Sequence, residues 1–367
     1  MEKTSLTQHK LVIDNITIIP IWSESMGAKS FSIFIDTGDV KILIDAGASI
    51  MQPSFPLSKE EKINYVRKAL DTIVQYSKNA DVVTITHYHY DHFRPNLLEL
   101  YIGKTILAKD PNKYINESQR KRAERFYSNL YSHLTGEKPK FLNNASKEEF
   151  ANPLEKLEHS MRIDFGDYST RRRQLIEEGL KRFQRLSDKW NSWQIIPEFK
   201  INNTRCFFAD NREFTFGKTI IRFGEPMFHG IEFSKVGWVV PIVIKRKDAK
   251  ILYTSDLSGP IIEDYADWII EENPDVLFID GPPTYLIPYM FNLINFRRCL
   301  ENLKRIVQEI DSRMIFLDHH LPRDIRFRAR LKEVYELARE RRKKVLTFAE
   351  FYGQTPLAEI LYQEKEK

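Results

Sequence analysis

The chain contains the stretch Thr86-His87-Tyr88-His89-Tyr90-Asp91-His92, in which four side chains able to bind a metal lie within six positions. It continues the apolar, β-branched run Asp81-Val82-Val83-Thr84-Ile85, whose composition predicts a buried strand. Neutral imidazole and carboxylate groups are ligands of zinc and similar first-row ions. Three of the nine histidines of the chain lie here, so a loop that is rich in histidine by chance is a much weaker interpretation. The sequence therefore predicts a metal site at the end of a strand.

The spacing within this loop also bears on the number of metals. Side chains alternate along an extended loop, so His87 and His89 would face one point while Asp91 and His92 face another. This arrangement favours two metals over one.

The composition is that of a soluble globular protein, with 42% hydrophobic and 29% charged residues among 367. No apolar run approaches the roughly 20 residues of a membrane span, and the first residues lack the apolar segment of a signal peptide. We therefore expect a cytoplasmic protein without a membrane partner. Two cysteines, Cys206 and Cys299, are too few for a disulfide framework and are not spaced as a metal knuckle.

The net charge of +5 is mild, but it is unevenly distributed. Residues 110–200 hold 18 basic and 14 acidic side chains, including the clusters Arg120-Lys121-Arg122 and Arg171-Arg172-Arg173. Such clusters are often solvated helix faces, which is the ordinary interpretation. The alternative is a surface for an anionic small molecule or a nucleic acid. The sequence gives no indication of the oligomeric state.

The alternation of strand and helix patterns predicts an α/β protein in which two sheets are sandwiched between helices. Residues 111–200 are charged, helical in pattern and poor in strand signals, so we expect one domain over 1–367 with a basic helical insertion or lid at 111–200. The expected strands are Asn15–Ile21, Phe31–Ile35, Val40–Ile44, Asp81–Thr86, Thr219–Phe223, Gly237–Lys245, Lys250–Thr254, Val276–Ile279 and Met314–Leu317. The expected helices outside the insertion are Ser58–Lys78, Leu293–Asp311 and Asp324–Lys343.

Further candidate ligands follow other predicted strands or turns. They are His229, Asp256, His319 and His320, with Asp45 as a candidate acceptor that would orient a ligand imidazole. A carboxylate at Asp256 could bridge two cations and offset their repulsion. Adjacent side chains diverge, so we expect only one of His319 and His320 to complete a second metal site. For His229, Asp256 and Asp45, a plain loop or turn residue is the ordinary alternative.

In the order of the chain, Asp45, the loop His87–His92, His229, Asp256 and a late histidine resemble the five motifs of the metallo-β-lactamase-fold hydrolases. The flanks Leu43-Ile44-Asp45-Ala46-Gly47 and Tyr253-Thr254-Ser255-Asp256 are also similar to that family, and the match runs from about residue 16 to 325. More narrowly, Asp280-Gly281-Pro282-Pro283-Thr284-Tyr285 and Asp318-His319-His320-Leu321-Pro322-Arg323-Asp324 resemble an archaeal group of these proteins. That narrower resemblance implies no substrate.

The resemblance implies a four-layer αββα metallo-β-lactamase-like sandwich with a dinuclear metal centre. One divalent ion would be held by His87, His89 and His229, and the other by Asp91, His92 and either His319 or His320, with Asp256 bridging. Zinc is the expected metal, with manganese or iron as alternatives. In relatives that process transfer RNA ends, an arginine lies four residues after the ligand, and Arg323 lies four after His319, which favours His319.

The expected reaction is hydrolysis by a metal-activated water, with Asp91 and Asp256 in the catalytic centre. A phosphodiester or phosphate ester, including nucleic acid, is the first substrate hypothesis, because the insertion is basic and Arg323 could bind an anion. Thr284 and Tyr285 would contact the substrate, or their loop would be a rigid connection.

Three other functions are compatible with parts of the pattern. The main alternative is hydrolysis of a lactone or thioester in a pocket walled by Trp22, Tyr88, Phe93 and Tyr285. Oxygen-handling di-iron proteins share the fold but normally carry a flavin-type electron-transfer domain, which this chain lacks. A binding protein without activity would be expected to have lost ligands, and none is missing from the motif set.

Overall fold

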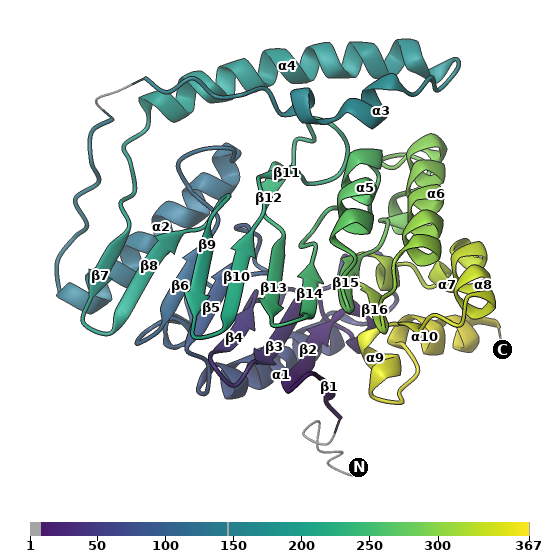
Figure 1. Ribbon diagram of the computed structural model, residues 1–367, viewed down its shortest axis with the longest axis horizontal. Coiled ribbons are helices and arrows are strands. Elements are labelled where there is room, and N and C mark those ends of the chain that lie inside the picture. Colours follow the sequence, from purple (N-terminus) through teal and green to yellow (C-terminus); the bar gives the residue numbers. More distant parts are fainter. Residues whose placement is uncertain (1–8, 145–146, 367) are drawn as a thin grey trace.

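Two large mixed sheets form the centre of the molecule. The computed structural model describes residues 9–144 and 147–366, and Figure 1 shows how the strands of that part are arranged. In spatial order the first sheet contains β1 (Leu11–Ile13), β2 (Ile16–Ser23), β3 (Phe31–Asp36), β4 (Lys41–Ile44), β5 (Val82–Ile85), β6 (Thr105–Ala108), β8 (Thr204–Phe208) and β7 (Phe199–Ile201). The second contains β17 (Val345–Leu346), β16 (Met314–Asp318), β15 (Val276–Asp280), β14 (Ala249–Tyr253), β13 (Ile242–Arg246), β10 (Thr219–Phe223) and β9 (Glu213–Phe216). A short pair, β11 (Met227–Phe228) and β12 (Trp238–Val239), lies apart from both.

Helices cover the outer faces of these sheets and form the segment between β6 and β7. They are α1 (Lys59–Ser77), α2 (Glu117–Thr135), α3 (Glu158–Arg162), α4 (Tyr168–Ser192), α5 (Glu263–Glu272), α6 (Leu293–Glu309), α7 (Phe327–Arg330), α8 (Lys332–Glu340), α9 (Phe348–Phe351) and α10 (Leu357–Glu366). None of the helices in the described part of the chain is long and apolar enough to cross a membrane.

The alternation of side chains along the central strands explains the layers. In β15, Val276 and Phe278 belong to the core between the two sheets, whereas Leu277 and Ile279 pack with α5, α6 and α8 in a second core. Both faces of this strand are therefore buried, which is why the sequence from 276 to 280 is apolar almost throughout. On the other side, Ala69 and Ile73 of α1 join the core of the first sheet. The result is the expected αββα sandwich of metallo-β-lactamase type.

The strand and helix predictions are largely confirmed. The helix expected at Ser58–Lys78 is α1, which Ser58 caps by accepting a hydrogen bond from the Glu61 amide. The strand expected at Gly237–Lys245 is wrong as a single element, because β12 ends at Val239 and β13 begins at Ile242, with Pro241 between them. The helix expected at Asp324–Lys343 is likewise divided into α7 and α8.

Some elements had no clear signal in the sequence. These are β1, β6, β7, β8, β9, β17, α5, α9 and α10, most of them short strands or helices at the margins of the sheets. Short elements carry little periodic pattern, so their formation depends on the neighbours against which they pair.

The segment expected to be helical contains α2, α3 and α4, with an isolated bridge between Leu142 and Ile195. Figure 1 shows α4 extending across one end of the molecule, beyond the ends of the strands and near β11 and α5. Its helical character agrees with the pattern. The division of the chain into one domain with an insertion at 111–200, and the role of that insertion as a lid, remain predictions.

Candidate metal centre

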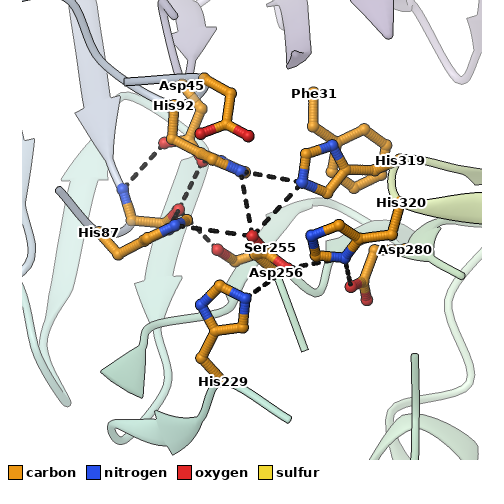
Figure 2. A network of polar contacts seen from close by, with 12 residues as sticks. Phe31, Asp45, His87, His92, His229, Ser255, Asp256, Asp280, His319 and His320 are labelled. Carbon is orange, nitrogen blue, oxygen red and sulfur yellow. Dashed lines mark hydrogen bonds and ion pairs between the residues drawn. The ribbon is translucent and has the colours of Figure 1, made fainter. Parts of the chain in front are cut away.

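Six imidazole and carboxylate side chains from distant parts of the sequence meet where strands of both sheets end. Figure 2 shows the rings of His87, His92, His229, His319 and His320 arranged around the carboxylate of Asp256. His87 and His92 follow β5, Asp256 follows β14, and the adjacent histidines follow β16. Because the carboxyl ends of neighbouring parallel strands lie at one edge of a sheet, β14 and β16 bring their loops to the same point.

The first group of donor atoms belongs to His87, His89, His229 and Asp256, which all lie within 4.8 Å of one another. His229 Nε2 is 2.9 Å from Asp256 Oδ1, and His87 Nε2 is 3.8 Å from Asp256 Oδ2. These are the residues expected to hold one metal together with the bridging carboxylate.

The second group contains Asp91, His92 and His319, whose donor atoms also lie within 4.8 Å of one another. His92 Nε2 is 3.2 Å from His319 Nε2. Asp256 Oδ2 lies 3.7 Å from the first of these nitrogens and 3.4 Å from the second. The Asp256 carboxylate is therefore placed between the two groups, as a bridging ligand requires.

The chemical state of these groups suits a metal. The Nε2 atom of His87 is buried and has no hydrogen-bond partner, which is costly unless something else occupies its lone pair. Burial and the neighbouring His229 lower the pKa of His89 to about 3, so its ring is neutral at neutral pH. Burial would raise the pKa of Asp91, but His92 and Arg323 outweigh it and keep the carboxyl ionised. Neutral imidazole and ionised carboxylate are the forms that bind cations.

His319 differs from His87, His89 and His320, whose pKa values burial lowers. Burial lowers its pKa, but the carboxylates of Glu24 and Asp256 outweigh burial and raise the pKa well above the ordinary value. Its ring also stacks on Phe31, with centroids 5.4 Å apart. The stacking and the two carboxylates fix the ring in place.

Two further carboxylates, of which Asp45 also lies within reach of His87 and His92, orient imidazoles of this cluster. Asp45, as expected, lies with Oδ2 2.7 Å from His92 Nδ1, and the same oxygen accepts a hydrogen bond from the Tyr253 hydroxyl at 2.9 Å. Glu24 has the corresponding position beside His319, with its Oε2 2.8 Å from His319 Nδ1. Such partners fix the tautomer and direction of a ligand ring. Sequence reasoning missed Glu24, which lies 295 positions from its partner.

The adjacent histidines do not diverge, so that expectation was wrong. The ring centroids of His319 and His320 are 4.4 Å apart, and His320 Nδ1 lies 3.0 Å from Asp256 Oδ1. Both residues have positive φ angles, of 50° and 45°, a region rarely adopted by residues other than glycine. This backbone turns both rings to the same carboxylate. His320 Nδ1 is also 3.3 Å from Asp280 Oδ2, a buried contact that the sequence did not predict.

The close approach of two loops positions His92. A Cβ atom on Gly47 would lie 2.4 Å from the Phe93 amide nitrogen and 2.6 Å from the His92 nitrogen. Only glycine therefore allows the loop that follows β4 to lie against the histidine loop, and this contact places Asp45 beside its imidazole partner.

The predicted substrate residues lie next to this cluster but have internal partners. Arg323 is buried; its Nε donates to Glu24 at 2.8 Å, and its Nη2 lies 3.3 Å from Asp91 Oδ2. The half-buried Tyr285 accepts from Arg323 Nη1 at 3.3 Å. Thr284 is fully buried, and its hydroxyl has no partner. Their roles toward a substrate remain predictions.

Three of the four aromatic residues expected to wall a pocket for a carbonyl substrate are buried in the core, whereas the fourth, Tyr285, is half-buried and lines a cavity. Tyr88 and Phe93 are fully buried, and Trp22 is only 6% exposed. Tyr88 instead donates its hydroxyl to the Lys109 carbonyl at 2.5 Å. The ring of Tyr88 also packs on Tyr127 and that of Phe93 on Phe126, both of α2, so these side chains offer no wall to a ligand.

The strand order, the four layers and the histidine–aspartate cluster define this chain as a metallo-β-lactamase-fold protein with a candidate metal centre, an architecture used by a class of metal-dependent hydrolases. Within that class it belongs to the UPF0282 family. It is 30% identical over 351 residues to a UPF0282 protein of Korarchaeum cryptofilum, covering 95% of this chain and 93% of the relative. It is 32% identical to one of Pyrococcus abyssi, covering 92% and 87%.

Other comparisons add less. No protein-family model matches the chain. Solved structures that resemble it include a variant of the CmlA β-hydroxylase, at 10% identity and a TM-score of 0.41, covering 86% of this chain and 50% of that one. Zinc-bound PqqB from Methylobacterium extorquens gives 12% identity and a TM-score of 0.37, covering 86% and 84%. Structural similarities with TM-scores this low give no information on the reaction, which has to be inferred from the side chains of the candidate metal centre.

Proposed function

We propose that the protein is a metal-dependent hydrolase of phosphodiester or phosphate-ester substrates. His87, His89 and His229 would hold one divalent ion, Asp91, His92 and His319 a second, and Asp256 would bridge them, with zinc as the expected metal. Bound there, such ions supply Lewis acidity, which acidifies water and stabilises negative charge on an oxyanion. A cytoplasmic location remains part of the proposal.

A set of cationic side chains beside the donor cluster is the observation that carries this substrate class. The ammonium of Lys29 is half-buried and interacts electrostatically with Asp91, Glu24 and Asp256. Within the described part of the chain it has no ion-pair or hydrogen-bond partner. Burial and the neighbouring Arg323 lower its pKa from an ordinary value of 10.5. A cation beside the donor cluster that is held in no direct ion pair favours an anionic ligand.

Arg122 of α2 adds a second cation on the other side of the loop. Its guanidinium lies 4.9 Å from the Tyr90 ring centroid and donates to the Tyr88 carbonyl at 3.1 Å. It is close enough to His89 to help lower the pKa of that imidazole. A phosphate ester has anionic oxygens that these groups can bind, whereas a lactone or thioester is neutral and gains nothing from them.

The protein side chains around the donors have distinct roles in this proposal. Asp45 and Glu24 hold the imidazoles of His92 and His319 in one orientation. Asp91 stays ionised, and the low pKa of its carboxyl makes it a weak base, so it orients the attacking water by accepting a hydrogen bond more than it removes a proton. Lys29 and Arg122 neutralise the oxygens of the phosphate that is attacked.

The basic clusters give limited support to a long nucleic acid. Arg120 is buried and donates to the carbonyls of Pro111 and Gln194, and Arg172 is buried against Glu232. One arginine of each cluster therefore holds the protein together instead of facing solvent. This favours a small anionic ester or a nucleotide end over a long strand.

The first test is metal content and substrate class. We expect about two equivalents of zinc or manganese per chain by elemental analysis, and turnover of a p-nitrophenyl phosphodiester or phosphomonoester but not of a lactone. Protein that holds no metal, and takes up none on titration, would refute the proposal. Turnover of the lactone alone would establish the carbonyl alternative.

The second test addresses the cations. Lys29→Gln should raise KM for the phosphate ester by about tenfold with a smaller change in kcat, because one anion contact is lost. Lys78→Gln, at an exposed position after α1, is the matched control and should leave both constants unchanged. Equal constants for the wild type and Lys29→Gln would remove the observation on which the substrate class depends.

A further inference from the structure

A cavity of about 230 Å³ is lined in part by Arg323, whose guanidinium also contacts Asp91 of the donor cluster. Four cationic side chains line it, from the segment around η6 (Leu321–Arg323), from α7 with its flanks, and from the C-terminal helix α10. They are Arg323, Arg326, Arg330 and Lys365. Asp324 is the one carboxylate that lines this cavity in the described part of the chain. The cavity is therefore strongly cationic.

Two of the four cations are already neutralised. Arg330 Nε donates to Asp324 Oδ2 at 2.6 Å, and Arg323 Nε donates to Glu24. The head groups of Arg326 and Lys365 have no ion-pair partner among the described residues, and both side chains are exposed. Two positive charges are thus free to meet a ligand.

A buried hydroxyl supplies an independent indication of a ligand. Thr284 lines the same cavity and is fully buried, and its Oγ1 has no hydrogen-bond partner. Buried polar atoms are seldom left without a partner unless a water, ion or ligand supplies one. A hydroxyl that can donate and free cations lining one cavity are groups that bind phosphate oxygens.

The cavity and the candidate metal centre share a wall. The guanidinium of Arg323 has Nη2 3.3 Å from Asp91 Oδ2 on the metal side and Nη1 3.3 Å from the Tyr285 hydroxyl on the cavity side. Arg323 is therefore common to both sites.

We propose that this cavity, lined by Thr284, Arg326 and Lys365, binds a second anionic group of the substrate, of the phosphate class. The inference rests on the proposed function, because it extends the substrate of the same centre. It narrows that substrate to an ester with a further phosphate close to the one that is cleaved, as in a nucleotide with phosphates on two positions.

Kinetics with a matched pair of substrates test the proposal. Two p-nitrophenyl phosphodiesters that differ by one additional phosphate group would be compared with wild-type protein and with the double variant Arg326→Gln/Lys365→Gln. The wild type should prefer the additional phosphate by about tenfold in kcat/KM, and the variant should lose that preference through KM. The simpler ester should be hydrolysed equally by both proteins.

The control variant Arg341→Gln/Lys344→Gln removes the same charge from exposed positions away from the cavity, and should keep the preference. A preference that survives in Arg326→Gln/Lys365→Gln, or that disappears equally in the control, would overturn the proposal, because general surface charge would then explain it. Thr284→Val keeps the shape of the side chain and should lower the preference by a smaller factor.

Binding of inorganic phosphate separates this inference from the proposed function. Calorimetry should show phosphate binding to the wild type that is about tenfold weaker in Arg326→Gln/Lys365→Gln, while the metal centre is the same in both. If neither ester is hydrolysed but this difference in binding is found, the proposed function fails and the anion site stands. If the esters are hydrolysed and phosphate binds both proteins equally, the anion site fails alone. If phosphate binding weakens but the substrate preference does not, the cavity binds a free anion and the inference about the substrate is wrong.

Discussion

Two buried polar clusters lie within the same part of the fold, and they are built in opposite ways. The first is the candidate metal centre around Asp256. The second contains Arg172 of α4, Glu232 of the loop after β11, and Glu263 and Arg298 of α5 and α6, each at most 8% exposed. Arg298 donates to both carboxylates at 2.8–2.9 Å, and Arg172 donates to Glu232 at 2.6 Å.

The difference lies in whether each cluster is complete in itself. In the Arg–Glu cluster two positive and two negative groups neutralise each other, and Arg172 Nε is the one fully buried polar atom of these four side chains without a hydrogen-bond partner. In the candidate metal centre, six imidazoles and the carboxylates of Asp91 and Asp256 face one another, and donor atoms such as His87 Nε2 have no hydrogen-bond partner. A buried group of opposite charges is satisfied by its own ion pairs, whereas a buried group of electron-pair donors is satisfied only when it binds a cation. Burial and polarity alone therefore do not identify a functional site, but the kind of group gathered there does.

The Arg–Glu cluster also helps to position the candidate metal centre. Glu232 lies three positions after His229, and it joins that loop to α4 and α6 through its two arginines. The loop that carries a candidate metal ligand is thereby fixed to the helical segment at 111–200.

The largest expected effect is the loss of turnover when donors are removed from the metal centre. His89→Ala and Asp256→Ala should each lower kcat by on the order of a thousandfold, because a ligand or the bridging carboxylate is lost. The free energy of unfolding, measured with urea, should change by no more than about 1 kcal/mol. Retained turnover in both variants would show that these residues are not ligands.

The Arg–Glu cluster should respond in the opposite way. Arg298→Met leaves Glu232 and Glu263 buried without their shared partner, and should lower the free energy of unfolding by about 3 kcal/mol. Arg297→Met, the exposed neighbour on α6, is the control and should change it little. A small effect of Arg298→Met in urea unfolding would contradict the view that this cluster is structural.

A smaller effect, on metal affinity, is expected when a carboxylate that orients a candidate ligand imidazole is replaced. Glu24→Gln should weaken metal affinity by about 10- to 100-fold, because the His319 ring loses its charged acceptor. Chelator competition measures this affinity, and Glu60→Gln, an exposed position in the first turn of α1, makes the same chemical change elsewhere. Equal affinities in the two variants would mean that Glu24 serves only as the partner of Arg323.

The smallest effect is a pH dependence of stability from the Arg–Glu cluster. Burial would raise the pKa of Glu232, but Arg298 and Arg172 outweigh it and lower the pKa below the ordinary value of 4.5. A carboxyl with a lowered pKa stabilises the fold above the unfolded value, and this stabilisation is lost as the pH falls through the folded one. The free energy of unfolding, measured with urea from about pH 6 to about pH 3, should be higher for the wild type than for Glu232→Gln, and this difference should become smaller as the pH falls. A difference in the free energy of unfolding that becomes larger in acid would mean that the pKa of Glu232 is raised in the folded protein and not lowered.

Much of the fold could be predicted from local patterns. Runs such as Val276–Asp280 and Met314–Asp318 are apolar on both faces, and the helix at Lys59–Ser77 has its capping residues in sequence. The candidate ligands were found because imidazoles and carboxylates follow such strands. Glu24 could not be found in this way, because a single glutamate outside any motif carries no signal of the ring it will meet.

The sequence by itself determined the type of chemistry, because the metal-binding groups are encoded in short runs whose residue types and strand-end positions are visible without coordinates. Only the tertiary structure decided which polar groups meet. It placed Glu24 against His319, turned His319 and His320 to one carboxylate, buried three of the four aromatic rings expected to line a pocket, and neutralised Arg172 and Arg298 inside the protein. The physical reason is that partners separated by tens or hundreds of positions are set by packing of the layers, and local sequence does not record that packing.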